Sequence, residues 1–210
     1  MMRGTLTILP VAVLATCAAS ACSEDATKDR AAIQPASAIA APASPASPAP
    51  PALTALGLEQ QRNPIEGVLT GGQPTDEQLQ RAKAMGVKTV INLRSAGESA
   101  DYAAQQAGAA ALGMTYIHIP IDSETGDGLD EDNARKLGAL LDRAARPMIV
   151  HCATGQRVGA LFALKAFHVD GETAAEALQL GKDAGLSKPA LLAIVTARMT
   201  GPGARPAKTK

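Results

Sequence analysis

Aromatic residues are almost missing from this chain of 210 residues: they make up 2% of it, with no tryptophan, two tyrosines and two phenylalanines. This scarcity argues against a platform on which nucleic-acid bases could stack. The chain also lacks an excess of charge, because 20 acidic and 20 basic residues leave a formal net charge of zero. We therefore expect no nucleic-acid partner, and a core built from Leu, Ile, Val, Ala and Met.

Cysteine is equally scarce, with three residues in the whole chain. Cys17 lies in an apolar N-terminal stretch and Cys22 at its end, which leaves Cys152 as the only thiol in the part expected to fold. Cys152 therefore has no expected disulfide partner. A lone cysteine is often a small buried hydrophobe. The residues around Cys152 favour a reactive thiolate instead.

Sequence signatures of bound metals and nucleotides are absent as well. His118 and His168 lie far apart in the pattern and show no metal-ligand spacing. No glycine-rich nucleotide motif and no serine-centred elbow occurs. We expect neither a metal nor another cofactor.

Residues 1–21 have the features of a secretory signal peptide. Met1–Arg3 is a short, positively charged start, and Leu6–Ala19 is nearly continuous apolar sequence. This run is too short for a comfortable bilayer span of about 20 residues. The small residues Ala19–Ala21 follow at a cleavage-like position. We predict export to an oxidising compartment, with a buried N-terminal helix as the alternative.

Cys22 follows these small residues directly, and Ala-Ser-Ala-Cys resembles a bacterial lipobox, whose cysteine is lipidated and becomes the new N-terminus. The resemblance implies a periplasmic lipoprotein, and Ser23 in place of aspartate favours the outer membrane. A signal that is simply cleaved is the alternative. Residues 22–55 are rich in Ala, Pro and Ser, with six prolines between Pro35 and Pro51. We predict that they form an unfolded tether.

Residues 56–200 are expected to fold as one domain, followed by a loose tail over residues 201–210. Short apolar strands alternate with helical patterns, and capping boxes mark helix starts at Thr75 and Thr173. This alternation predicts an α/β fold with a parallel sheet, right-handed crossovers and helices on both faces. The predicted strands are 87–93, 114–119 and 148–150, and the predicted helices are 75–85, 98–111, 131–145, 158–168 and two that begin near Thr173 and Ser187.

Three polar residues follow predicted strands: Arg94, Asp122 and Cys152. In parallel α/β sheets, ligands bind beyond the carboxyl ends of the strands. If the strands are parallel, all three residues lie at the same edge. This placement favours an enzyme independently of any motif.

The stretch from Cys152 to Val158 has the pattern of an anion cradle. A buried strand runs into a turn of small residues and then into a helix start, so turn amides and the helix N-terminus converge. These groups and Arg157 would hold Cys152 as a thiolate nucleophile. Arg157 could bind two oxygens of a phosphate with its planar fork. The other residues predicted to bind the substrate are Ala153, Thr154, Gly155, Gln156 and Val158.

Asp122 is the best candidate for the proton donor, because it lies in a polar loop that could fold over the site. Glu124 and Asp127 are the next candidates. The alternative for Asp122 is a solvated loop carboxylate.

Two more residues are expected to support the site. His151 would tune the thiolate, or else serve as a core histidine at a strand end. Arg94 would add positive field, although an ion pair with Glu98 is the stronger expectation.

The segment from His151 to Arg157, His-Cys-Ala-Thr-Gly-Gln-Arg, resembles the His-Cys-x-x-Gly loop of the protein tyrosine and dual-specificity phosphatases. Gly71–Thr75, Val90–Arg94 and Ile117–Pro120 also match, and residues 67–199 look like the phosphatase-like domain of beta-lactamase hydrolase-like proteins and of small bacterial tyrosine-phosphatase-like proteins. The resemblance implies a Cys152 nucleophile, an Arg157 oxyanion binder and a phosphocysteine intermediate. It also implies a phosphorylated small molecule or phosphoprotein, of phosphotyrosine-like chemistry, as the partner.

Two departures from that family leave the reaction open. Four residues separate Cys152 from Arg157, where the family has five, and Val158 stands where the family has Ser or Thr. The shorter loop resembles that of the rhodaneses, whose cysteine carries sulfur as a persulfide, and a smaller amide ring fits a smaller group. The sequence thus supports three hypotheses: a cysteine-dependent phosphatase, a sulfurtransferase, and a non-catalytic phosphate-binding module.

Overall fold

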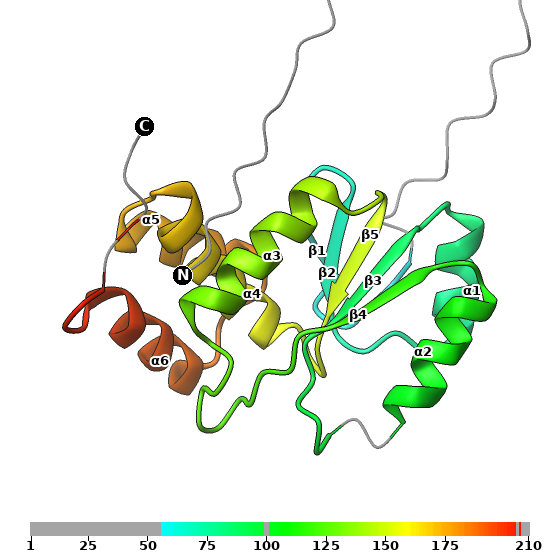
Figure 1. The fold of residues 1–210 in the computed structure, drawn as a ribbon, viewed down its shortest axis with the longest axis horizontal. Helices are drawn as coiled ribbons and strands as arrows, with labels where there is room; N and C mark the ends of the chain where they lie inside the picture. The colour runs from blue at the N-terminus through cyan, green and yellow to red at the C-terminus, as the bar shows by residue number, and fades with distance from the viewer. Residues whose placement is uncertain (1–55, 99–100, 205, 207–210) are drawn as a thin grey trace, which may run out of the picture. The chain divides into compact units, whose positions relative to one another are not determined.

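The computed structural model describes residues 56–98, 101–204 and 206. A five-stranded sheet in the order β1-β2-β5-β3-β4 runs through this part of the chain (Figure 1). The predictions for residues 1–55, which include the signal peptide, Cys22 and the tether, lie outside the described residues. The strands are β1 (Arg62–Ile65), β2 (Val68–Gly71), β3 (Thr89–Asn92), β4 (Thr115–His118) and β5 (Met148–His151).

The predicted α/β fold is confirmed, with one correction to the sheet. β2, β5, β3 and β4 are parallel, but β1 pairs with β2 in the antiparallel sense. Only Glu66 and Gly67 separate these two strands, and a connection of two residues can join antiparallel strands only. Gly67 has a φ of +71°, a backbone conformation that glycine adopts without a steric penalty.

The helices cover both faces of the sheet. Figure 1 shows α1 and α2 on one face, and α3 to α6 on the other. The capping boxes at Thr75 and Thr173 are both formed. The helices are α1 (Asp76–Ala84), α2 (Tyr102–Ala111), α3 (Glu131–Arg143), α4 (Gln156–Lys165), α5 (Ala174–Asp183) and α6 (Pro189–Thr200), with a π-helical turn, Ala166–Asp170, at the end of α4.

Alternating residues of the strands serve two separate cores. In β5, Met148 and Val150 pack with the large cluster that includes residues of α3 to α6, whereas Ile149 packs with the cluster under α1 and α2. His151 is two residues beyond Ile149 and lies on the same side as that residue. Cys152 belongs to the large cluster.

Helix α4 is the most enclosed of the helices, since all residues from Arg157 to Leu164 are buried. Its position next to α5 depends on Gly159, where an added Cβ would lie 2.4 Å from the carbonyl oxygen of Gly181 in α5 and 2.3 Å from the backbone nitrogen of Leu186, just after α5. The N-terminus of α4 is thereby held at the carboxyl edge of the sheet.

None of the helices in the described residues is both long enough and apolar enough to cross a membrane.

Candidate active site

A short loop, residues 152–155, connects β5 to the first turn of α4. Cys152 is buried, with 1% of its surface exposed. The backbone N–H of Gly155 donates a hydrogen bond to the Cys152 Sγ, with 3.1 Å between nitrogen and sulfur. Gly155 has a φ of +86°, which turns the chain back toward the sulfur and which a side chain would disfavour. The loop therefore directs a backbone dipole at the sulfur.

The neighbouring segment, Gly71–Gln73, holds this loop from one side. The N–H of Cys152 donates to the carbonyl of Gly71 at 3.3 Å, and the N–H of Gln73 donates to the carbonyl of Ala153 at 3.1 Å. Gly72 pairs with Thr154. A Cβ at Gly72 would lie 2.8 Å from the carbonyl oxygen of Ala153, so only glycine allows this approach.

Gln156 holds the loop from the other side. Its side-chain oxygen accepts hydrogen bonds from the N–H groups of Ser187 and Lys188, both at 2.8 Å, just before α6. Its side-chain nitrogen donates to Ser187 Oγ at 2.9 Å and to Gln60 Oε1 at 3.0 Å. The side chain is thus used in fixing the loop to α6, and only the backbone of Gln156 remains for a substrate.

Arg157 is also buried, with 3% of its side chain exposed. Its Nη2 donates to Glu98 Oε1 at 2.9 Å, and its Nη1 donates to Glu98 Oε2 and, at 2.9 Å, to the carbonyl of Ile121. These bonds use three of the five N–H groups of a guanidinium. The N–H on Nε and one N–H on Nη2 take no part in these three bonds and face away from Glu98, and they are the pair that a bidentate oxyanion would need.

The Arg157 guanidinium interacts with Cys152 as well as with Glu98. Burial acts to lower the pKa of Arg157, but the hydrogen bond with Glu98 and the charge and hydrogen bond of Cys152 outweigh it, so the pKa is raised. The arginine is therefore a permanent cation beside the sulfur.

Glu98 is a residue of the site that the sequence did not reveal. Its hydrogen bond with Arg157 lowers the pKa of the Glu98 carboxyl to about 2. The expected ion pair between Arg94 and Glu98 is wrong: Arg94 donates to the backbone carbonyl of Glu98 and forms its ion pair with Asp101, at 3.3 Å. The helix expected from Glu98 begins instead at Tyr102. The one available signal was that Glu98 follows β3 at the edge where Arg94 and Cys152 lie.

Asp122 lies in the loop after β4, at the same edge. Its Oδ1 accepts hydrogen bonds from the N–H of Glu124 and the N–H of Thr125, both at 2.8 Å, and from Thr125 Oγ1 at 3.1 Å. These bonds, led by that of the Thr125 backbone, lower the pKa of Asp122. Glu124 and Asp127 are exposed members of the same turn, in which the carbonyl of Asp127 accepts from the N–H of Asp122.

His151 is fully buried on the α1 and α2 side of the sheet. Burial lowers the pKa of His151 to about 4, so the imidazole is neutral near pH 7. Its Nδ1 lies 3.4 Å from the carbonyl oxygen of Cys152, and its Nε2 has no hydrogen-bond partner among the described residues. The imidazole thus contacts the backbone of Cys152 and contributes no positive charge to its sulfur.

The structure brings together only part of the predicted set. Cys152, Gly155 and Arg157 converge, with the amide of Gly155 and the guanidinium both at the sulfur. Arg94 reaches the site through Glu98, and the side chain of Val158 is buried in the core. No group of three or more His, Cys, Asp and Glu residues that could hold a metal ion occurs in the described part of the chain.

Comparison with known proteins shows which family and which solved structures this chain resembles. Residues 66–168 match the family model of the phosphatase-like domain of beta-lactamase hydrolase-like protein. No curated protein matches the chain.

Several solved structures share the fold. A candidate phosphatase from Shewanella putrefaciens CN-32 is 22% identical with a TM-score of 0.51, over 68% of this chain and 94% of that one. A candidate phosphatase from Neisseria meningitidis Z2491 is 19% identical with a TM-score of 0.53, over 65% and 96% of the two chains. Tk-PTP is 17% identical with a TM-score of 0.50, over 67% and 95%. Identities this low establish the fold alone. Residues 66–168 are therefore similar to the phosphatase-like domain of beta-lactamase hydrolase-like protein, and the chain shares its α/β fold with these solved phosphatase-like structures.

Proposed function

We propose that this domain hydrolyses phosphomonoesters through a Cys152 thiolate. The observation that carries the proposal is the convergence of two buried groups on one sulfur: the Gly155 N–H at 3.1 Å and the Arg157 guanidinium. The edge of the Arg157 fork that faces away from Glu98 supplies two parallel N–H groups for the oxygens of a phosphate. The start of α4 adds partial positive charge at the same place.

The reaction has two steps. The Cys152 sulfur forms a bond to phosphorus while the bond from phosphorus to the ester oxygen breaks, and the leaving oxygen takes a proton from a carboxylic acid. A water oxygen then attacks phosphorus, the sulfur–phosphorus bond breaks, and a proton of the water returns to the carboxylate. The products are the alcohol, inorganic phosphate and the thiolate.

Asp122 is our candidate for the acid, and its lowered pKa has a consequence. A general acid must be protonated, so activity that depends on Asp122 falls as the pH rises through its pKa. Because the hydrogen bonds from Thr125 and Glu124 lower that pKa, the fall begins at more acidic pH than for an ordinary aspartate. An Asp122→Asn variant with an unchanged pH profile would remove Asp122 from this role.

The decisive experiment offers an aryl phosphate to the full chain and to Cys152→Ser. We expect phosphate release by the natural sequence and a loss of about a thousandfold or more in the variant, because serine is a far weaker nucleophile. Binding of inorganic phosphate by Cys152→Ser serves as the control for an intact loop. Equal phosphate release by the two proteins would contradict a cysteine mechanism.

The spacing of the loop favours one alternative reaction. Only four residues separate Cys152 from Arg157, which gives a smaller ring of amides than five residues would. In a sulfur transfer, the Cys152 thiolate takes the outer sulfur of thiosulfate and sulfite leaves, and cyanide then takes that sulfur to form thiocyanate. Thiocyanate without phosphate release would favour this reaction over ours. Turnover of neither substrate, with phosphate binding retained, would favour a non-catalytic binding module.

The N-terminal sequence adds a proposal about location. We propose that Cys22 is lipidated and that the protein is an exported, membrane-anchored lipoprotein, on the strength of the apolar run before it and the Ala-Ser-Ala-Cys sequence. Labelling of cells with palmitate tests this: incorporation should occur in the natural protein and be lost in Cys22→Ala.

A further inference from the structure

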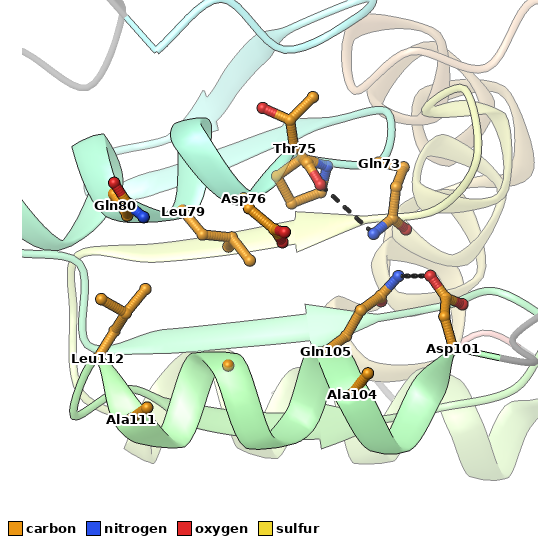
Figure 2. Close-up of a pocket in the computed structure, with 12 residues that line it drawn as sticks. Gln73, Thr75, Asp76, Leu79, Gln80, Asp101, Ala104, Gln105, Ala111 and Leu112 are labelled. Carbon is orange, nitrogen blue, oxygen red and sulfur yellow. Dashed lines mark hydrogen bonds between the residues drawn. The ribbon is translucent and has the colours of Figure 1, made fainter.

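A groove of about 720 Å³ lies between α1 and α2. Figure 2 shows its lining residues on both helices and on the turn before α1. The groove exists because α2 presents small residues to it: Ala104, Gly108 and Ala111 line one wall, and Leu79 of α1 lines the other. A Cβ added at Gly108 would meet nothing within 4 Å, apart from the backbone of its own helix. A volume of roughly 300 to 1,000 Å³ is typical of small-molecule sites.

One end of the groove opens beside the Cys152 loop. Gln73 lines this end, and its N–H donates to the carbonyl of Ala153 at 3.1 Å. Since neighbouring Cα atoms are about 3.8 Å apart, the backbone nitrogen of Gln73 is within about 10 Å of the Cα of Cys152. Asp101 lines the same end, and Arg94 donates to both Gln73 Oε1 and Asp101 Oδ1 at 3.3 Å. The same arginine donates to the carbonyl of Glu98, the partner of Arg157.

The charge of the lining selects the kind of ligand that fits. No lysine or arginine lines the groove, whereas two carboxylates, Asp76 and Asp101, do. Arg94 neutralises Asp101, but Asp76 forms no ion pair with any described residue. The ammonium group of Lys83 lies against Gly113, outside the lining. A second phosphate in this groove would be repelled, and an ammonium group would be attracted.

The hydrogen-bonding groups of the lining point to the same ligand chemistry. Three carboxamides, of Gln73, Gln80 and Gln105, line the groove, and each can both donate and accept. Gln105 donates to Asp101 and accepts from the hydroxyl of Tyr116 at 2.8 Å, whereas Gln80 is exposed and has no hydrogen-bond partner among the described residues. Such groups suit hydroxyl and amino groups of an alcohol.

We infer that the groove between α1 and α2 is the subsite for the alcohol part of the substrate, and that it takes an uncharged or positively charged, hydroxyl-bearing alcohol without a second phosphate. This inference rests on the proposed phosphatase function. The substrate then spans the sheet edge, with its phosphoryl group at the Cys152 loop and its alcohol past Gln73 into the groove.

Three sugar phosphates test the charge preference of the full chain. Glucosamine 6-phosphate carries an ammonium group at mildly acidic pH, glucose 6-phosphate is neutral beyond its phosphate, and fructose 1,6-bisphosphate carries a second phosphate. At low ionic strength we expect kcat/KM to be highest for the ammonium sugar, about fivefold lower for the neutral one and lowest for the bisphosphate. In Asp76→Asn, kcat/KM for glucosamine 6-phosphate should become about equal to kcat/KM for glucose 6-phosphate. A preference for the bisphosphate would overturn the inference.

A second variant tests the location. Gly108→Leu fills the groove with a side chain, and leucine also favours a helix more than glycine does. We expect a loss of about tenfold in kcat/KM for glucosamine 6-phosphate. The matched control is Ala107→Leu, the neighbouring exposed position of α2 outside the lining, which should keep the natural value.

Binding to Cys152→Ser separates the two proposals. Titration calorimetry with glucosamine 6-phosphate should show binding that Gly108→Leu and Asp76→Asn weaken in this background. If the natural chain releases no phosphate but this pattern holds, the phosphatase proposal fails and the subsite stands. If neither variant changes binding or turnover, the subsite is wrong, whatever the reaction.

Discussion

The two faces of the sheet differ in how closely their helices pack. We name the side under α3 to α6 the closed face and the side under α1 and α2 the open face. On the closed face, a Cβ at Gly159 would lie 2.3 Å from the backbone nitrogen of Leu186. On the open face, a Cβ at Gly108 would meet nothing within 4 Å, and a groove of about 720 Å³ remains. The same residue type marks close contact on one side and empty space on the other.

The closed face supports the Cys152 loop, whereas the open face leaves space for a ligand. The closed face contains the large apolar cluster that includes Cys152 and Val158 of α4, so the Cys152 loop rests on a tightly packed base. The open face has a smaller cluster and small residues along α2, which leave room for a ligand. Both faces end at the same edge, where Gln73 of the open side bonds to Ala153 of the loop.

Replacing Gly159 and Gly108 by alanine should test the difference between the two faces most directly. Gly159→Ala places a methyl group against backbone atoms and should lower the free energy of unfolding by about 3 kcal/mol. Gly108→Ala adds a methyl group in open space and should raise it by about 0.5 to 1 kcal/mol, because alanine is the better helix former. Urea unfolding of both variants measures the two changes. Shifts of the same sign would mean that the faces do not differ in this way.

Lowering the pH should destabilise the folded protein because of His151, which is buried on the open face. The pKa of His151 is about 4 in the folded protein and 6.5 when unperturbed. The unfolded state therefore takes up a proton first, and stability is full above about pH 6.5 and falls as the pH drops toward 4. We expect a loss of about 2 kcal/mol between pH 7 and pH 5.

Urea unfolding at these two pH values, for the natural protein and for His151→Gln, measures this loss. The variant will be less stable at both values, but the part of the pH dependence due to His151 should disappear. An unchanged pH dependence in the variant would show that His151 is not the group responsible.

The smallest expected effect concerns the link between the loop and α6. Gln156→Ala removes the acceptor for the N–H groups of Ser187 and Lys188, which resembles the loss of a helix cap, and should lower the free energy of unfolding by about 1 kcal/mol. Because the loop also loses its anchor to Gln60, kcat for the aryl phosphate should fall while the fold persists. Thr196→Ala, on the exposed surface of α6, is the control. Equal kcat in both variants would show that Gln156 does not position the loop.

The sequence predicted the strands that are continuous apolar runs and the helices with capping boxes, because both signals are local. Neither β1 nor β2 was predicted. The residues of β1, Arg-Asn-Pro-Ile, include a proline and polar side chains and depend on pairing with β2, and β2, Val-Leu-Thr-Gly, has only two apolar residues in a row. Cys152 and Arg157 could be predicted because they share one loop. Glu98 could not, because its partner is 59 residues away and the pair exists only after the sheet has formed. The groove between α1 and α2 is likewise a product of packing that no local pattern records.

The ion pair between Glu98 and Arg157 also fixes the orientation of the guanidinium before any ligand binds. A buried guanidinium without a partner would have to be desolvated and oriented when a ligand arrives. Here Glu98 and the carbonyl of Ile121 fix its plane in advance. Little side-chain entropy is left to lose on binding, and the edge of the fork that faces away from Glu98 has one orientation in space. If the site binds phosphate as we propose, it should therefore discriminate among anions by the positions of their oxygens as well as by their charge.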